Sequence, residues 1–307
     1  MKENEKNLVK NLIAGGIAGA VSRSVVSPLE RLKILYQLMP QSSSVKTSTK
    51  PSAKILLRHL KEIYLADGWR GFFRGNGTNI VRIIPYSAVQ FATYETVKKA
   101  LNNPEATSCK LLSGAAAGIA SVTCTYPLDL VRTRLSLPGP PTTFLKAFNK
   151  VYYQEGGFPA LYRGLIPTVA GIAPYVALNF TVYETLKSYA ISYYYPNLTK
   201  KTSINNPSRH SSELPIPVRL LCGGLAGAVS QSCTFPLDVL RRRMQVSRLS
   251  MQANPQGPIQ LAIFIFKTEG WQAFYQGMLP NLLKVVPAIS TSFVVYEWSK
   301  ASLNSIF

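Results

Sequence analysis

The sequence has few of the residues on which metal sites and nucleophilic catalysis depend. Its 307 residues include two histidines, His59 and His210, and four cysteines. These residues do not follow a Cys-x-x-Cys or Cys/His ligand spacing, which argues against the common zinc signatures and a His-based catalytic site. We therefore expect no metal, no cofactor and no enzymatic activity.

Acidic residues are also scarce. The chain contains 14 Asp and Glu against 34 Lys and Arg, which gives a formal net charge of +20. Such an excess indicates anionic partners, among which nucleic acid, anionic lipid and a phosphorylated solute are the candidates. The apolar fraction of 47% fits either two soluble domains or one membrane bundle.

The first ten residues lack the apolar core of a secretory signal, and Glu3 and Glu5 make them unlike an acid-poor transit peptide. We expect any organelle address to lie within the mature chain. No Asp-x-Asp-x-Asp-Gly loop is present, so regulation by calcium is not expected.

One pattern, Pro-x-acid-x-x-base, occurs three times in the chain. The copies begin at Pro28, Pro127 and Pro236, at spacings of 99 and 109 residues. On a helix the acid and the base at i and i+3 share a face, and the proline bends the helix beside them. Each copy follows an apolar stretch with a Gly-x-x-x-Gly pair, which lets helices approach closely in a bilayer. Three copies indicate three tandem repeats.

Each repeat predicts two membrane-spanning helices with a short amphipathic helix between them. The long stretches cover residues 8–38, 77–101, 108–137, 166–192, a segment that opens at Val218, and 279–303. The short helices are expected at 53–66, 142–154 and 258–268, with a loop at 41–52. The fold class is therefore an all-α membrane protein with six transmembrane helices, and a soluble all-helical protein is the disfavoured alternative. We place the repeats at 8–104, 105–195 and 215–305, with a polar linker at 196–214.

A second motif closes the last long helix of each repeat. The sequence Tyr-Glu-x-x-Lys begins at Tyr94, Tyr183 and Tyr296, and each of its acids lies ten residues after a proline. The residues three positions before those prolines are Arg82, Gly171 and Lys284. At about 1.5 Å per residue they lie about 20 Å from the Tyr-Glu pair, which is close to the depth of the bilayer centre.

These motifs, with an acidic-Gly and an aromatic-basic-Gly signature after each Pro-x-acid-x-x-base, resemble the mitochondrial carrier family over about residues 11–300. The resemblance implies threefold pseudosymmetry, three short matrix-side helices and alternating access around a central substrate site. It also implies a multi-pass monomer of the inner mitochondrial membrane, with both termini on the intermembrane-space side. Cardiolipin and other membrane lipids would be partners, and nucleic acid would not. In the third repeat Gln276 replaces the basic residue of the signature.

The same resemblance implies two gates made of ion pairs. The matrix gate would pair Glu30 with Arg132, Asp129 with Arg241 and Asp238 with Lys33, braced by Gln37 and Gln245. The second repeat has Ser136 where a third brace would lie. The cytoplasmic gate would pair Glu95 with Lys187, Glu184 with Lys300 and Glu297 with Lys98, braced by Tyr94, Tyr183 and Tyr296.

The candidate substrate residues are those expected at mid-depth, namely Arg23, Arg82, Gly171, Ile172, Tyr175 and Lys284. Arg23 lies five residues before Pro28, and its repeat equivalents are Val122 and Gln231, so symmetry does not demand its charge. Three cations with no acid expected at their level would suit a polyanion such as a phosphorylated solute. The Gly171-Ile172 pair leaves flat apolar room for an aromatic base, on which Tyr175 could stack, although packing between helices would explain the tyrosine equally well.

Within the family, these positions resemble the nucleotide-type subgroup of fungal adenylyl-sulfate, coenzyme A and ATP-Mg/phosphate carriers. The favoured function is exchange of adenosine 5′-phosphosulfate, 3′-phosphoadenosine 5′-phosphosulfate or a related adenine nucleotide. The alternatives are a coenzyme A carrier and an ATP-Mg/phosphate carrier without calcium regulation. An alternative of another class is a membrane adaptor that keeps the fold without transporting.

Overall fold

The computed structural model of the chain describes residues 2–38, 53–101, 106–140, 142–194, 215–247 and 257–306. Within these ranges the chain is helical, and they contain no β-strand. The loop predicted at 41–52 and the polar linker predicted at 196–214 lie outside the described residues.

The helices follow the order that the repeats predict. The first unit contains α1 (Lys2–Val25), α2 (Ser27–Leu38), α3 (Ala53–Gly71), α4 (Asn76–Val81) and α5 (Ile83–Ala100). The second contains α6 (Thr107–Leu135), α7 (Phe144–Glu155), the 3-10 helix η1 (Phe158–Tyr162) and α8 (Leu165–Tyr194). The third contains α10 (Ile216–Val246), α11 (Pro258–Glu269), the 3-10 helix η3 (Trp271–Tyr275), α12 (Met278–Leu283) and α13 (Val285–Ile306).

Three stretches that the sequence predicted as single helices are each divided in two. The breaks fall at Val26, Arg82 and Lys284, two or three residues before a proline. Proline has no N–H to donate to the carbonyl four residues earlier, and its ring crowds that carbonyl, so the helix weakens one turn before it. Two of the candidate substrate residues, Arg82 and Lys284, thus lie at breaks in their helices.

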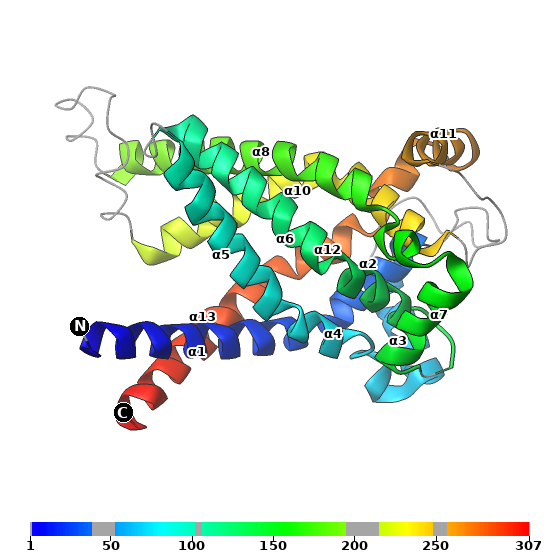
Figure 1. Cartoon of the computed structure of the whole chain (residues 1–307), viewed down its shortest axis with the longest axis horizontal. Helices are drawn as coiled ribbons and strands as arrows, with labels where there is room; N and C mark the ends of the chain where they lie inside the picture. Colours follow the sequence, from blue (N-terminus) through cyan, green and yellow to red (C-terminus); the bar gives the residue numbers. More distant parts are fainter. Residues whose placement is uncertain are drawn as a thin grey trace.

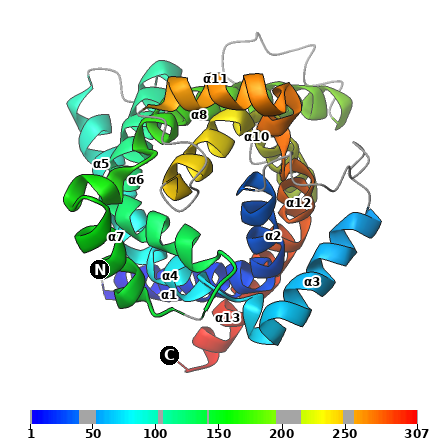
Figure 2. The same ribbon diagram turned by 90° about the vertical axis from the view of Figure 1, so that its right-hand side faces the viewer.

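The long helices form a closed ring. The last long helix of each unit packs along the first helix of the next, with α5 against α6, α8 against α10, and α13 against α1. Figure 1 shows the start of α1 and the end of α13 at one end of the molecule, and α3, α7 and α11 at the other. Figure 2 looks from that second end and shows α3, α7 and α11 around the outside of the ring.

Four described helical stretches are long and apolar enough to cross a membrane, namely Ser108–Leu135, Phe158–Tyr193, Val218–Val246 and Trp271–Ser302. They carry large hydrophobic side chains that no protein surface covers, such as Ile166, which is 68% exposed. An outward apolar face of this kind is suited to lipid rather than to water. None of these four stretches lies in the first unit. There α1 contains the charged residue Arg23, and α5 has only 18 residues after the break at Arg82.

Three glycines join the outer helices to the ring. Gly75, Gly164 and Gly277 have φ angles of 78°, 85° and 85°, in the left-handed region that favours glycine. An added Cβ atom at Gly75 would lie 2.9 Å from the carbonyl oxygen of Arg132 of the next unit. The same contact recurs between Gly164 and Arg241 at 2.9 Å, and between Gly277 and Lys33 at 3.0 Å. Only a residue without a side chain lets the units approach this closely.

We expect Gly164→Ala to lower the unfolding temperature of the purified protein. A left-handed alanine costs about 1–2 kcal/mol, and its methyl group would also meet the Arg241 carbonyl. The matched control is Gly77→Ala in α4, where an added Cβ has no neighbour within 4 Å among the described residues. That control should be neutral or slightly stabilising, by roughly 0.5–1 kcal/mol. Equal unfolding temperatures for the two variants would contradict this account of the turn.

Candidate functional site

Three ion pairs join α2, α6 and α10, each between two different units. Arg132 binds Glu30. Arg241 Nη2 lies 2.6 Å from Asp129 Oδ2, and Lys33 Nζ lies 2.6 Å from Asp238 Oδ2. We call these six residues the charge ring. The pairs are the three that the family resemblance implied. The side chains are largely withdrawn from solvent, which makes loss of one partner costly for the other.

Glutamines support two of the three pairs. Gln37 Nε2 donates to Asp238 at 3.2 Å, and Gln245 Nε2 donates to Asp129 at 3.0 Å. Both side chains are fully buried. Ser136 holds the equivalent position in the second unit, but its hydroxyl donates to the Arg132 carbonyl of its own helix at 2.9 Å. The Glu30–Arg132 pair therefore lacks the glutamine contact that the other two pairs receive.

Two candidate substrate cations bind carboxylates of the charge ring. Arg82 Nη1 lies 3.1 Å from Asp129 Oδ1, and Lys284 Nζ lies 3.1 Å from Glu30 Oε1. The sequence-based expectation that these cations have no acid at their level is therefore wrong. Counting residues along separate helices locates the Cα atoms, whereas long basic side chains reach well beyond their own level. Arg23 differs, because its Nη1 donates to the neutral Asn79 Oδ1 at 3.2 Å.

Positive charge exceeds negative charge around the ring. Arg242 also reaches Asp129, at 3.2 Å. Among the described residues, six cations contact the three carboxylates: Lys33, Arg82, Arg132, Arg241, Arg242 and Lys284. Arg23 interacts electrostatically with Glu30 without contacting it, and with Arg23 included the excess is four positive charges. Unmatched cations in a partly buried site attract anions strongly.

A pocket of about 280 Å³ lies beside the charge ring, between α5, α6, α8 and α10. Gly171, Ile172 and Tyr175 are among its lining residues. Ile172 also packs against α6, because a Cβ at Gly118 would lie 3.0 Å from its Cγ2 atom. A Cβ at Gly171 would lie 3.6 Å from Leu237 of α10. The Gly-Ile pair thus contributes to helix packing and to one wall of the pocket.

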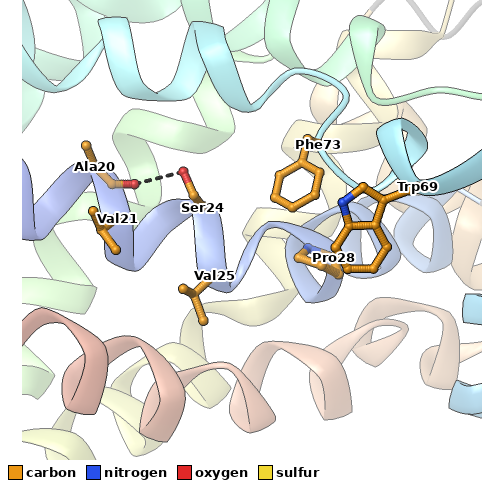
Figure 3. A pocket seen from close by; sticks show the side chains of 7 residues that line it. All are labelled: Ala20, Val21, Ser24, Val25, Pro28, Trp69 and Phe73. Carbon is orange, nitrogen blue, oxygen red and sulfur yellow. Dashed lines mark hydrogen bonds between the residues drawn. The ribbon is translucent and has the colours of Figure 1, made fainter.

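A larger hollow, of about 460 Å³, lies between α1 and the end of α3. Figure 3 shows Pro28 beside Trp69 and near Phe73, with Val21 and Val25 farther back along α1. Its lining includes no charged residue among those that the structure describes. An apolar hollow on this face does not suit a polyanion, so it is not the candidate substrate site.

The second set of predicted ion pairs lies in α5, α8 and α13, away from the charge ring. Here Lys187 Nζ lies 3.3 Å from both carboxylate oxygens of Glu184, three residues earlier in the same helix, and 6.0 Å from the centre of the Tyr183 ring. The sequence paired Lys187 with Glu95 instead. The interhelical pairs Glu95–Lys187, Glu184–Lys300 and Glu297–Lys98, with Tyr94 and Tyr296, stay predictions.

Sequence reasoning missed a set of three arginines, which we call the arginine clamp: Arg31, Arg134 and Arg243. Each donates its Nε–H to a backbone carbonyl of the next unit, namely Ser136, Gln245 and Gln37, at 3.1, 3.1 and 3.0 Å. Each also binds the acid at the end of its own outer helix, namely Asp67, Glu155 and Glu269. The clamp thus links α3, α7 and α11 to the neighbouring unit.

The sequence held a partial signal for the clamp. Arg134 and Arg243 both lie two residues after the basic residue of the repeated motif, but the first unit has Leu35 there. Its clamp residue is Arg31, four residues earlier, which lies on the same face of the helix one turn away.

Burial raises the pKa of Asp67, but hydrogen bonds from Arg31 and Arg74 outweigh burial and hold that pKa below its ordinary value.

Comparison with known proteins gives consistent matches along the chain. The family model for mitochondrial carrier proteins matches residues 4–105, 103–194 and 212–306. An uncharacterized mitochondrial carrier of Saccharomyces cerevisiae is 40% identical over 91% of this chain and 87% of its own length. The mitochondrial adenine nucleotide transporter of Arabidopsis thaliana is 37% identical over 98% and 89%. The mitochondrial carrier protein CoAc1 of Zea mays is 37% identical over 93% of this chain and 84% of its own length.

The three matches of the family model succeed one another over almost the whole sequence, and they coincide with the three units that carry the charge ring. The chain belongs to the mitochondrial carrier family.

Proposed function

We propose that the protein exchanges an adenine-containing anionic nucleotide across the inner mitochondrial membrane by alternating access. In this proposal six helices with threefold pseudosymmetry cross the membrane, with the charge ring on the matrix side and both termini in the intermembrane space. The observation that carries the proposal is the excess of four positive charges beside a pocket with aromatic and apolar walls. A cargo with several phosphate charges and one flat ring matches both features.

Adenosine 5′-phosphosulfate and its 3′-phosphorylated form are the cargoes that we favour. The Arabidopsis thaliana relative, named as an adenine nucleotide transporter, supports the adenine moiety. Coenzyme A is the second candidate, since it carries adenine and several phosphate charges and would also balance the excess of cations. An ATP-Mg/phosphate exchange without calcium regulation is the third.

The contacts of Arg82 and Lys284 suggest how cargo binding would act on the matrix gate. A phosphate group would compete with Asp129 for Arg82 and with Glu30 for Lys284, because these acids are the partners of the two cations. Withdrawal of Lys284 would leave Glu30–Arg132, the pair without a glutamine brace, as the weakest link of the ring. Cargo would thereby lower the barrier to opening of the matrix gate, and the second set of ion pairs would then close.

Uptake by the purified protein in liposomes tests the function. The internal and external solutes would be a panel of adenosine 5′-phosphosulfate, its 3′-phosphorylated form, ATP, coenzyme A, phosphate and a guanine nucleotide. We expect exchange of at least one adenine-containing polyanion and not of the guanine nucleotide. Absence of any exchange, where another carrier reconstituted in parallel is active, would favour the adaptor alternative.

Removal of a cargo cation should abolish exchange without unfolding the protein. We expect Arg82→Ala and Lys284→Ala each to reduce uptake to the background of empty liposomes, because each would leave cargo phosphate unpaired. The matched control is Lys267→Ala on α11, whose side chain is exposed and which should transport normally. Wild-type uptake by either of the first two variants, with an unchanged unfolding temperature, would show that the substrate site is placed wrongly.

A glutamine at position 136 should strengthen the weak link of the ring. The side chain has room, because Gln37 and Gln245 occupy the same place in the other units. A hydrogen bond to a charged group contributes roughly 1.5–3 kcal/mol, so we expect Ser136→Gln to raise the unfolding temperature of the empty protein and to slow exchange at least about tenfold. Ser136→Ala is the control and should exchange at close to the wild-type rate. Ser136→Gln with wild-type stability and rate would rule out the weak-link mechanism.

A further inference from the structure

Gln231 has a polar side chain in the pocket that the proposed mechanism does not use. It lies on α10, five residues before Pro236, and it lines the 280 Å³ pocket together with Gln90 of α5. Its side chain is half-buried. Among the residues that the structure describes, none forms a hydrogen bond with this amide. A primary amide offers two donors and an acceptor, so Gln231 is available to a bound molecule.

The surroundings of Gln231 limit what that molecule can be. The pocket is slightly smaller than the roughly 300–1,000 Å³ of a complete ligand site, so it would hold only one part of a nucleotide. Its walls near α6 and α8 are small or apolar, with Gly114, Gly118, Val122 and Ile172. Tyr86 and Tyr175 add aromatic rings. Flat apolar walls with aromatic edges favour a planar ring.

The charged groups define the direction of the cargo. Arg241 lines the same pocket ten residues after Gln231 on α10, which corresponds to about 15 Å along the helix axis. On α5 the guanidinium of Arg82 lies 5.7 Å from the centre of the Tyr86 ring. The pocket therefore has a charged end near the charge ring, lined by Asp238 and Arg241 with Arg82 beside Tyr86, and an amide end toward the middle of α10. Phosphates at the first end would direct the base of the nucleotide toward the second.

The three repeat-equivalent positions differ in a way that fits this arrangement. Arg23, Val122 and Gln231 occupy the same place in their units, yet one is cationic, one apolar and one an amide. Arg23 is held by Asn79, while Val122 and Gln231 both line the pocket. Threefold packing does not require an amide at position 231, so the residue at this position can serve to bind the cargo.

We propose that Gln231 binds the edge of the adenine base and sets the preference for a purine that carries an amino group at C6. Its amide oxygen accepts a hydrogen bond from the N6 amino group, and its amide N–H donates to the adjacent ring nitrogen. Glutamine side chains form the same bidentate pair with adenine in the major groove of DNA. The inference rests on the proposed nucleotide exchange and adds the residue that selects the base.

A double-mutant cycle between the side chain and the amino group tests this inference. The full chain, purified in detergent, is titrated with ATP and with purine riboside 5′-triphosphate, which is the same molecule without the amino group. Binding is followed by the shift of the unfolding temperature. Wild type should bind ATP about tenfold more tightly than the analogue, as expected for a lost hydrogen bond that leaves its partner unpaired. In Gln231→Ala and in the similarly sized Gln231→Met, both ligands lose the hydrogen bond to the ring nitrogen, but only ATP also loses the bond of its amino group, so the two affinities should agree within about twofold.

Gln90→Ala is the matched control, since it removes the other amide of the same pocket, and it should keep the wild-type preference. Retention of the preference in both Gln231 variants, or its loss in Gln90→Ala instead, would overturn the assignment. So would a wild-type protein that binds both triphosphates equally. Failure of wild type to bind any adenine nucleotide would be a different result, because it would overturn the proposed function together with this inference.

Discussion

The structure depends on three carboxylates that are withdrawn from water and can stay charged only while cations surround them. A buried carboxylate that loses its partners carries a large desolvation cost, so Glu30, Asp129 and Asp238 hold α2, α6 and α10 together. The same requirement connects the charge ring to the proposed cargo site, since Arg82 and Lys284 bind two of these acids. Two groups of cations thus share one set of anions, and a bound polyanion would redistribute them.

The ion pairs of the charge ring keep their positions because the backbone around them has little conformational freedom. Gly75, Gly164 and Gly277 bring each outer helix against a carbonyl of the next unit, and the arginine clamp fixes the same junctions with hydrogen bonds. The prolines place breaks at Arg82 and Lys284, so that these side chains leave their helices beside the ring. Rigid junctions and bent helices would suit the two-state movement of the proposed alternating access.

The repeated motifs predicted the helical architecture because those motifs recur at fixed spacing, and the family resemblance implied the three pairs of the charge ring. They did not predict the contacts that break the repeat. Arg82 and Lys284 reach acids of other units, and a distance of that kind depends on side-chain reach across helices rather than on position along one helix. The clamp role of Arg31 was not predicted for a related reason. Arg31 lies one turn before the position of the other two clamp arginines, so an alignment of the units shows Leu35 at that position.

The acceptors of the arginine clamp have a consequence for how the protein can change over time. Each clamp arginine binds the backbone carbonyl at position 37, 136 or 245, and every amino acid supplies that group. An exchange of the side chain at these positions therefore leaves the hydrogen bond of the clamp in place. The clamp and the glutamine contact to an ion pair thus depend on different atoms of the same residue. Under the proposed function, a single substitution at such a position would change the speed of exchange while the clamp stays intact.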